Sequence, residues 1–210
     1  MLSEEKLAAL FKAKVISSFR ILALILGWKL VTNGLQSGNT PSRSLTTTIE
    51  FPSWTRTDFR LSSVETFTEA DFRFIFDVNV LGVLNVTAAC VPYMKAGSAV
   101  VNFASVDGFT VSRGQLLYGA SKSAVIMITK SLALELAHKG IRVNGIAPGW
   151  VATPGNAATG RMEEAAKSIP IGRVAQPSEI AEWVWLLSDS TKAGFVDGET
   201  IVISGADVMR

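Results

Sequence analysis

From residue 67 onward, apolar positions follow the period of a helix in some stretches and form short continuous runs in others. Helical spacing and capping residues predict helices that begin at 68, run from about 116 to 138, and cover 161–167 and 177–188. In the last of these, the inward residues are expected to be Ile180, Trp183, Val184 and Leu187. Apolar runs predict strands at 99–104, 141–147 and 200–204. This alternation predicts an α/β fold with a parallel sheet that carries helices on both faces.

The predicted helix at about 116–138 is apolar on most of its surface. One set of apolar residues recurs at every fourth position and a second set lies on further faces: Ala120, Ala124, Ile128 and Leu132, then Val125, Met127 and Leu134. One face of a sheet cannot cover a helix that is apolar on most sides. We therefore expect a partner subunit to pack against this helix.

The first 66 residues show a different pattern. A helix is expected at 3–14, and the apolar runs at 15–19 and 21–27 each suit a buried strand. Residues 32–63 are rich in Thr, Ser, Asn, Gly and Pro, which is loop-like and long for a connection inside a compact domain. The longest apolar segment, 21–28, is too short to cross a bilayer, and the acidic start of the chain is atypical of a signal peptide. We therefore expect no membrane segment and a cytoplasmic protein.

Length and composition narrow the function classes. A chain of 210 residues suits one domain, and 48% hydrophobic residues are enough for a sizeable core. The net charge of +2 provides no basic stripe that would indicate nucleic acid, and no metal site is predicted. The single cysteine, Cys90, excludes an intramolecular disulfide and fits a reducing compartment. Its place in an apolar helix favours a buried structural thiol over a nucleophile.

The candidate catalytic residues lie between Ser105 and Lys122. Tyr118 and Lys122 are four residues apart, so a helix places them on one face, one turn from each other. A phenol with a pKa near ~10 is a poor acid or base at neutral pH, and a fixed ammonium nearby lowers that pKa. A serine hydroxyl at the end of the preceding strand could bind a carbonyl or alcohol oxygen. Taken alone, the pair is also typical of two ordinary helix side chains, so its context decides.

Two further features supply that context. Ser105 and the Pro148-Gly149 pair both directly follow predicted strands, and ligands of parallel sheets bind at the carboxyl ends of strands. Asn79 falls on the apolar face of the helix that begins at 68, where an unpartnered amide would cost on the order of 1–3 kcal/mol. Asn79 is either a satisfied core asparagine or a group that positions a water or the backbone at a site.

Together these residues resemble the tetrad of the short-chain dehydrogenase/reductase family. The tetrad residues would be Asn79, Ser105, Tyr118 and Lys122. The segment from Pro148 to Thr153, PGWVAT, is similar to the Pro-Gly-x-x-x-Thr segment of the family. Further segments that resemble its C-terminal region are 170–173, 177–181 and 197–202. The resemblance covers residues 67–209, about two thirds of the chain.

The resemblance implies NAD- or NADP-dependent interconversion of a carbonyl and an alcohol. Tyr118 would be the general acid or base, Lys122 would lower its pKa and hold the nicotinamide ribose, and Ser105 would orient the substrate oxygen. Asn79 would support a water that links Lys122 to solvent. The carboxamide end of the cofactor would be met by the residues Pro148, Gly149, Val151 and Thr153. Members of the family commonly form dimers or tetramers, which here implies a homodimer or homotetramer through the 118–138 helix.

The first third of the chain departs from the family pattern. The family begins with a strand and a Gly-rich turn that holds the pyrophosphate at a helix N-terminus. The nearest candidate here, residues 32–40, has an inserted residue and Thr40 in place of the third glycine. Only about forty residues separate this turn from Asn79, too few for two further strand–helix units and a strand. The expected fold is therefore a Rossmann-like, doubly wound, three-layer sheet that lacks the first βαβ unit. Residues 1–66 would be its divergent or truncated N-terminal part and 67–210 its catalytic part.

Two functions follow from this sequence. The complete tetrad favours an oxidoreductase that acts on a small-molecule carbonyl or alcohol. The missing phosphate turn favours a non-catalytic relative that acts only as a packing or oligomerising subunit. Binding of the nicotinamide cofactor separates the two.

Overall fold

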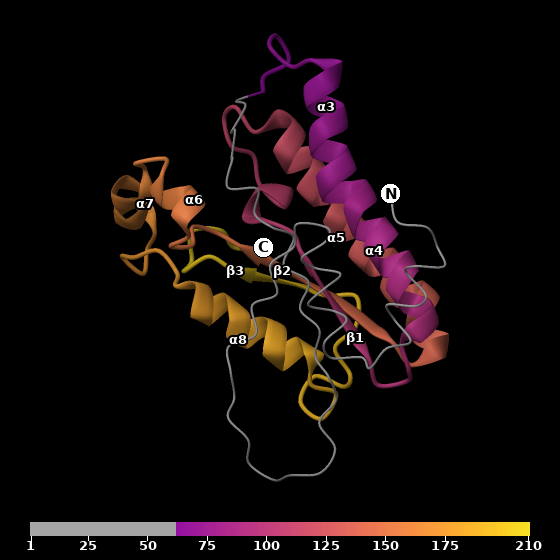
Figure 1. The fold of residues 1–210 in the computed structure, drawn as a ribbon. Coiled ribbons are helices and arrows are strands. Elements are labelled where there is room, and N and C mark those ends of the chain that lie inside the picture. The colour runs from indigo at the N-terminus through magenta and orange to yellow at the C-terminus, as the bar shows by residue number, and fades with distance from the viewer. Residues whose placement is uncertain (1–61) are drawn as a thin grey trace. The chain divides into compact units, whose positions relative to one another are not determined.

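The computed structural model describes residues 62–210, and three parallel strands form the sheet of this part of the chain (Figure 1). The strands lie in the order β1 (Ala99–Phe103), β2 (Arg142–Pro148) and β3 (Thr200–Ile203). Ala99 pairs with Arg142, and Gly145 pairs with Thr200. The predicted parallel α/β fold is confirmed, and each predicted strand is found to within one residue at either end.

Helices connect the strands at the positions that the sequence predicts. They are α3 (Glu69–Phe76), a π-helical turn (Asp77–Leu81), α4 (Gly82–Cys90), α5 (Leu116–Leu136), α6 (Pro154–Ala157), α7 (Met162–Ser168) and α8 (Pro177–Ser188). Single 3₁₀ turns lie at Val91–Tyr93, Val106–Gly108 and Ala137–Lys139. The short helix α6 and the π-helical turn were not predicted.

The ends of these helices follow from local chemistry. The Thr68 hydroxyl accepts from the Asp71 amide at 3.1 Å, and the Asp71 carboxylate accepts from the Thr68 amide at 3.3 Å, which completes the predicted capping box. After α5, Gly140 takes the left-handed conformation with φ of 67°, which suits glycine because it has no Cβ. The start of α3 and the end of α5 are thus encoded by residues next to the helices.

The sheet lies between two layers of helix. Val100 and Val143 point to one face, where they pack with Ala133 and Leu136 of α5. Ile146 points to the other face and packs with α8. Figure 1 shows α5 and α8 on opposite sides of the sheet. Successive side chains of each strand point to opposite faces of the sheet, so helices pack on both faces and form three layers.

The inward face of α8 is partly as predicted. Ile180, Val184 and Leu187 are buried in the core beside Ile146. Trp183 was expected to be inward, but 37% of it is exposed. Its side chain lines an open cavity of about 540 Å³ beside β3 and the C-terminal residues. The helical period places Trp183 next to the core, but the sheet ends at β3 in the described residues and leaves the ring uncovered.

The surface formed by α3, α4 and α5 is apolar and uncovered within the described residues. Phe74 of α3, Leu84 of α4, and Met127 and Leu134 of α5 are all exposed. The helical stretch Glu69–Tyr93 is long and apolar enough to cross a membrane, judged by length and composition alone. Buried core helices of soluble proteins meet the same criterion, so this stretch does not decide between a membrane and a protein partner.

Several predictions concern residues 1–61, which lie outside the described part of the chain. They are the helix at 3–14, the apolar runs up to 28, and the candidate turn at 32–40. The boundary between 66 and 67 also stays a prediction. In the described part, Ser62 already bonds to residues that precede and begin α5, because its amide donates to the Gly114 carbonyl at 2.9 Å.

Candidate active site

Tyr118 and Lys122 lie on one face of α5, as predicted. The helix begins at Leu116, so both residues belong to its first two turns. The Lys122 Nζ lies 5.6 Å from the centre of the Tyr118 ring. It donates a hydrogen bond of 3.0 Å to the carbonyl oxygen of Phe103, the last residue of β1. The ammonium is therefore held between the phenol and the carboxyl end of a strand.

Ser105 lies at the same strand end, two residues beyond Phe103. It follows β1 with an extended backbone and caps the short turn Val106–Gly108, where its Oγ accepts from the Asp107 amide at 3.2 Å. The Ser105 side chain is buried, and it acts on the Tyr118 phenol in the direction that lowers the phenol pKa. The predicted trio of Ser105, Tyr118 and Lys122 is thus brought together.

The direction of the Tyr118 pKa differs from the prediction. The sequence predicts a phenol pKa lowered by Lys122, but burial raises the Tyr118 pKa above its ordinary value. The Ser105 hydrogen bond acts in the lowering direction, and the charge of Asp107 raises the pKa further. In this site, loss of water around the phenol is the largest cause and outweighs the hydrogen bond from Ser105.

Burial also acts on Lys122. It lowers the pKa of the ammonium from its ordinary value of 10.5 to about 8. The unfolded chain then binds more protons than the folded chain between about pH 8 and 10.5. The free energy of unfolding therefore rises with pH across that window, and Lys122 contributes no slope well below pH 8.

Because of this pKa shift, the stability of the wild-type chain should depend on pH in a way that is lost in the variant Lys122→Met. Without added cofactor, the wild-type chain should gain stability relative to the variant between pH 8 and 10.5, by on the order of 1–3 kcal/mol after allowance for the part of the side chain that water reaches. Urea unfolding of both proteins at half-unit pH steps measures the difference. Parallel pH curves for the two proteins would contradict the prediction.

Asn79 is linked to the same helix by its side chain. Its Nδ2 donates to the Ser121 Oγ at 2.9 Å, and that hydroxyl donates to the Tyr118 carbonyl at 2.7 Å. Asn79 lies in the π-helical turn Asp77–Leu81, and π-helical turns are frequent at functional sites. The Asn79 amide therefore has a hydrogen-bond partner, as expected for a satisfied core asparagine. That partner, Ser121, lies in the same turn of α5 as Tyr118.

Pro148 and Gly149 lie at the carboxyl end of β2, at the same edge of the sheet as Ser105. The Gly149 amide donates to the Ile203 carbonyl at 2.9 Å. A Cβ at Gly149 would lie 3.3 Å from the Cα of Ser204, tighter than nine in ten real contacts. Glycine therefore suits the close passage of the chain beside the end of β3.

Val151 and Thr153 continue from this strand end into a short helix. The Val151 carbonyl accepts from the Thr153 amide and from Asn156 Nδ2, both at 2.8 Å. The Val151 amide donates no hydrogen bond to any residue in 62–210. The Thr153 hydroxyl caps α6 by accepting from the Asn156 amide at 3.2 Å. The threonine followed by Pro154, which suits the first position of a helix, is the sequence signal that could have predicted α6.

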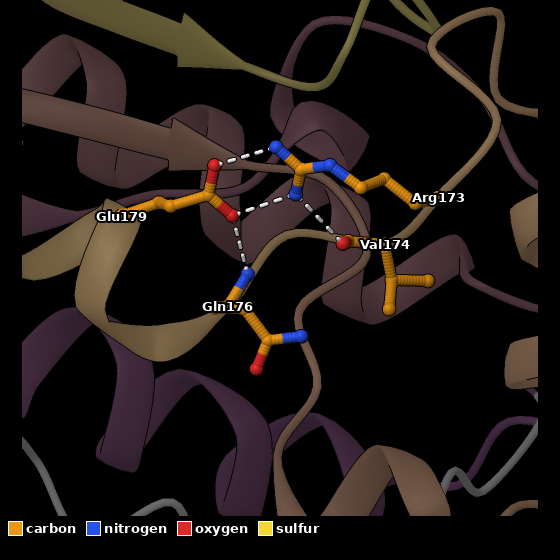
Figure 2. A network of polar contacts seen from close by, with 4 residues as sticks. All are labelled: Arg173, Val174, Gln176 and Glu179. Atoms are coloured by element: carbon orange, nitrogen blue, oxygen red, sulfur yellow. Dashed lines mark hydrogen bonds and ion pairs between the residues drawn. The ribbon is translucent and has the colours of Figure 1, made fainter.

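An ion pair that the sequence reading missed holds the segment opposite Val151 (Figure 2). Arg173 donates two hydrogen bonds of 2.7 Å to the Glu179 carboxylate, which also accepts from the Gln176 amide at 2.8 Å. The Arg173 hydrogen bonds are the main cause that lowers the Glu179 pKa to about 2. Between these residues, Ala175 pairs with Val151. The Arg173–Glu179 ion pair therefore flanks the segment that pairs with Val151.

The part of the chain that the structure describes has no candidate metal site. It contains no group of three or more His, Cys, Asp or Glu side chains that could hold a metal ion. Cys90 is partly buried, and burial raises the pKa of its thiol. A raised pKa disfavours the thiolate, so the thiol is suited to a structural role.

Comparison with known proteins assigns this arrangement to a family. The family model described as Enoyl-(Acyl carrier protein) reductase matches residues 54–205, which is more than half of the chain. The chain belongs to the short-chain dehydrogenase/reductase family. The predicted resemblance is therefore confirmed, and its range extends upstream of residue 67.

Curated relatives agree with this assignment. The 3-oxoacyl-[acyl-carrier-protein] reductase FabG of Thermotoga maritima is 40% identical over 148 residues, which cover 67% of this chain and 58% of the relative. The oxidoreductase UcpA of Escherichia coli K12 is 37% identical over 163 residues, which cover 71% of this chain and 62% of the relative. The chain thus spans less than two thirds of the length of these short-chain dehydrogenases/reductases.

Solved structures confirm the fold. A 3-oxoacyl-[acyl-carrier protein] reductase from Brucella melitensis with bound NAD is 37% identical, with a TM-score of 0.63 over 70% of this chain and 55% of that chain. A short-chain dehydrogenase/reductase from the same organism, described as a glucose/ribitol dehydrogenase, is 34% identical with a TM-score of 0.64 over 68% of this chain and 58% of that chain. The described residues therefore have the Rossmann-like fold of the family.

Proposed function

We propose that this chain is an oxidoreductase that interconverts a carbonyl and an alcohol with NAD or NADP, and that Tyr118 is its general acid or base. The observation that carries the proposal is the meeting of Ser105, Tyr118 and Lys122 at the carboxyl end of β1. The phenol would give its proton to a carbonyl oxygen and recover it afterwards.

The three side chains divide the work of proton transfer. Tyr118 holds its proton at neutral pH, because burial keeps its pKa above the ordinary value, and it would give that proton to the carbonyl oxygen during reduction. Ser105 orients the substrate oxygen, because its hydroxyl lies against the phenol and can donate to the same oxygen. Lys122 stabilises the phenolate that forms after proton transfer, and Asn79 supports the water that returns a proton through Lys122.

The residues after β2 fit the nicotinamide end of the cofactor. The Val151 amide, which has no partner within residues 62–210, can donate to a carboxamide oxygen, and the Thr153 hydroxyl retains a proton to donate. Pro148 ends β2, and Gly149 lets the chain pass close to β3. Tyr118 and Lys122 would meet the nicotinamide ribose. When bound, the cofactor supplies or accepts the hydride at the reacting carbon.

The substrate class is a small or lipophilic carbonyl or alcohol. The relatives differ in what their names say they act on: one acts on 3-oxoacyl chains of an acyl carrier protein, and another is described as a glucose/ribitol dehydrogenase. A 3-oxoacyl thioester is therefore a suitable first substrate, because several of the similar proteins carry that name.

A second copy of the chain is the proposed partner. The apolar surface of α4 and α5, with Met127 and Leu134 exposed, supports a homodimer or homotetramer through the 118–138 helix. We assign the protein to the cytoplasm, residues 1–66 to the N-terminal part of the same domain, and residues 67–210 to its catalytic part. Packing between copies would also cover the stretch Glu69–Tyr93, and this favours a protein partner over a membrane.

Cofactor binding and turnover test the proposal. NADH or NADPH is expected to quench the tryptophan fluorescence of the purified 210-residue chain, and acetoacetyl thioester is expected to be reduced with loss of absorbance of the reduced cofactor. Absence of binding at millimolar NADH and NADPH would overturn the enzyme proposal. The same exposed apolar surface favours the second function, a packing subunit, which predicts an oligomer that binds neither cofactor.

A further inference from the structure

Asp107 places a carboxylate in the turn between Ser105 and the helix that carries Tyr118. Its backbone amide donates to the Ser105 Oγ at 3.2 Å, so the backbone of Asp107 is tied to a residue of the site. Asp107 is not among the residues through which the sequence resembles the family. The candidate site therefore has a charged neighbour that the family pattern does not explain.

The turn that contains Asp107 packs closely against the first turns of α5. A Cβ at Gly119, the residue after Tyr118, would lie 2.9 Å from the Asp107 carbonyl oxygen, closer than real Cβ atoms approach such a group. One helical turn further on, the Ser123 Oγ donates to the Gly108 carbonyl at 2.8 Å. The backbone of Asp107 is thus held against the turn of α5 that contains Tyr118.

The Asp107 side chain is held by Ser112. The Ser112 Oγ donates to Asp107 Oδ1 at 2.6 Å, and this contact closes the loop that follows the turn. Oδ2 accepts no hydrogen bond from any residue in 62–210, and Asp107 forms no ion pair with any of them. The charge of this carboxylate is therefore not compensated by a cation of the described part of the chain.

The position of the Asp107 charge affects the phenol. A negative charge near an ionisable phenol disfavours the phenolate. Burial is the largest cause that raises the Tyr118 pKa, the Ser105 hydrogen bond lowers it, and the Asp107 charge raises it further. Both the packing of the turn and this electrostatic effect therefore connect Asp107 to Tyr118.

Other charged groups lie on α5 and on the elements that pack against it. They are Lys122, Lys130 and Glu135 of α5, Arg113 of the preceding loop, Glu69, Asp71 and Arg73 of α3, Asp77 of the π-helical turn, Arg142 of β2, and His138 and Lys139 at the far end of α5. Glu69 pairs with Arg73 at 2.6 Å. Arg142 donates to carbonyls at the end of α8. Among the charged groups in 62–210, Asp107 is the one whose charge contributes to the raised Tyr118 pKa.

We propose that Asp107 is a positioning residue of the site, whose carboxylate is held by Ser112 at the turn beside Tyr118, so that its negative charge acts on proton transfer by the phenol. The inference rests on the proposed function and adds a residue outside the tetrad. Asp107 contacts neither substrate nor cofactor in this account. When an alcohol is oxidised, the phenol must have lost its proton before it can take one from the substrate. The Asp107 charge therefore moves this reaction to higher pH.

The phenol can be titrated directly, because the chain contains only two tyrosines. In a Tyr93→Phe background of the full 210-residue chain, the phenolate absorbance at rising pH reports Tyr118 alone, without cofactor. Asp107→Asn removes the charge but keeps an oxygen that can accept from Ser112, and it is expected to shift the titration midpoint to lower pH. Ser112→Ala keeps the charge but frees the carboxylate, so its midpoint should lie between the other two. Far-UV circular dichroism at each pH restricts the comparison to folded protein.

The pH profile of kcat for alcohol oxidation measures the same effect during turnover. The rise of kcat should begin at lower pH in Asp107→Asn than in the wild type, with little change in the KM of the oxidised cofactor. A purely structural role would lower kcat at every pH and leave the midpoint in place. The control is Glu69→Gln, which removes an exposed carboxylate of α3 and should leave both midpoints unchanged.

The outcomes separate this inference from the enzyme proposal. Equal midpoints for Asp107→Asn and the wild type, in a chain that turns over substrate, would overturn the role of Asp107 while the enzyme proposal stands. A Ser112→Ala midpoint equal to that of the wild type would overturn the role of Ser112. A shifted titration midpoint in a chain that turns over no carbonyl or alcohol would overturn the proposed function, because the charge would then act on a phenol that transfers no proton to a substrate.

Discussion

Replacing Tyr118 with Phe is expected to lower kcat by about 10²- to 10⁴-fold, the range typical of the loss of a positioned acid or base. The ring remains, so packing around it changes little, and only the proton that meets the carbonyl oxygen is lost. Ser105 and Lys122 stay in place, because Ser105 is held by the Asp107 amide and Lys122 by the Phe103 carbonyl. Binding of the cofactor should change by less than tenfold.

Single-turnover kinetics and fluorescence titration measure the two effects separately. The matched control is Tyr93→Phe, since Tyr93 is the other of the two tyrosines and is largely exposed at the end of the 3₁₀ turn Val91–Tyr93. It should leave kcat within twofold of the wild type. A Tyr118→Phe variant that retains more than a tenth of wild-type kcat would show that another group transfers the proton.

Features encoded by neighbouring residues could be predicted from the sequence. The capping box of Thr68 and Asp71 and the glycine at 140 set helix ends through contacts within four residues. The spacing of Tyr118 and Lys122 places them on one helix face for the same reason. The strand ends at Ser105 and Gly149 follow from apolar runs that stop there. These predictions hold because helices and strands are defined by short-range geometry.

Features that depend on tertiary burial could not be predicted. The spacing of Tyr118 and Lys122 indicates a lowered phenol pKa, but the described site removes water from the phenol and raises it. Ser121 carries no signal as a single serine in a helix, and its contact with Asn79, 42 residues away in sequence, forms only when the turn of Asn79 packs against α5. Trp183 has the right helical period to be inward, but the width of the sheet decides its exposure.

The apolar surface of α5 leads to the second large expected effect. Met127 and Leu134 are seven residues apart and so lie on one face, and they are 61% and 83% exposed. A fully buried side chain of this size contributes about 1.5–3 kcal/mol relative to an exposed one. In a symmetric dimer each residue is buried twice, so a charge at both positions removes this gain and places carboxylates in an apolar interface.

We therefore expect the double variant Met127→Asp/Leu134→Asp to raise the Kd of the dimer by more than about a hundredfold, with the monomer still folded. The control is Val111→Asp, which changes a residue that is 98% exposed and lies in the loop before α5. Sedimentation over a range of protein concentrations measures the dissociation, and far-UV circular dichroism verifies the fold. A wild-type chain that is monomeric at 100 µM, or a double variant that still sediments as the wild-type oligomer, would show that this face of α5 is not the interface.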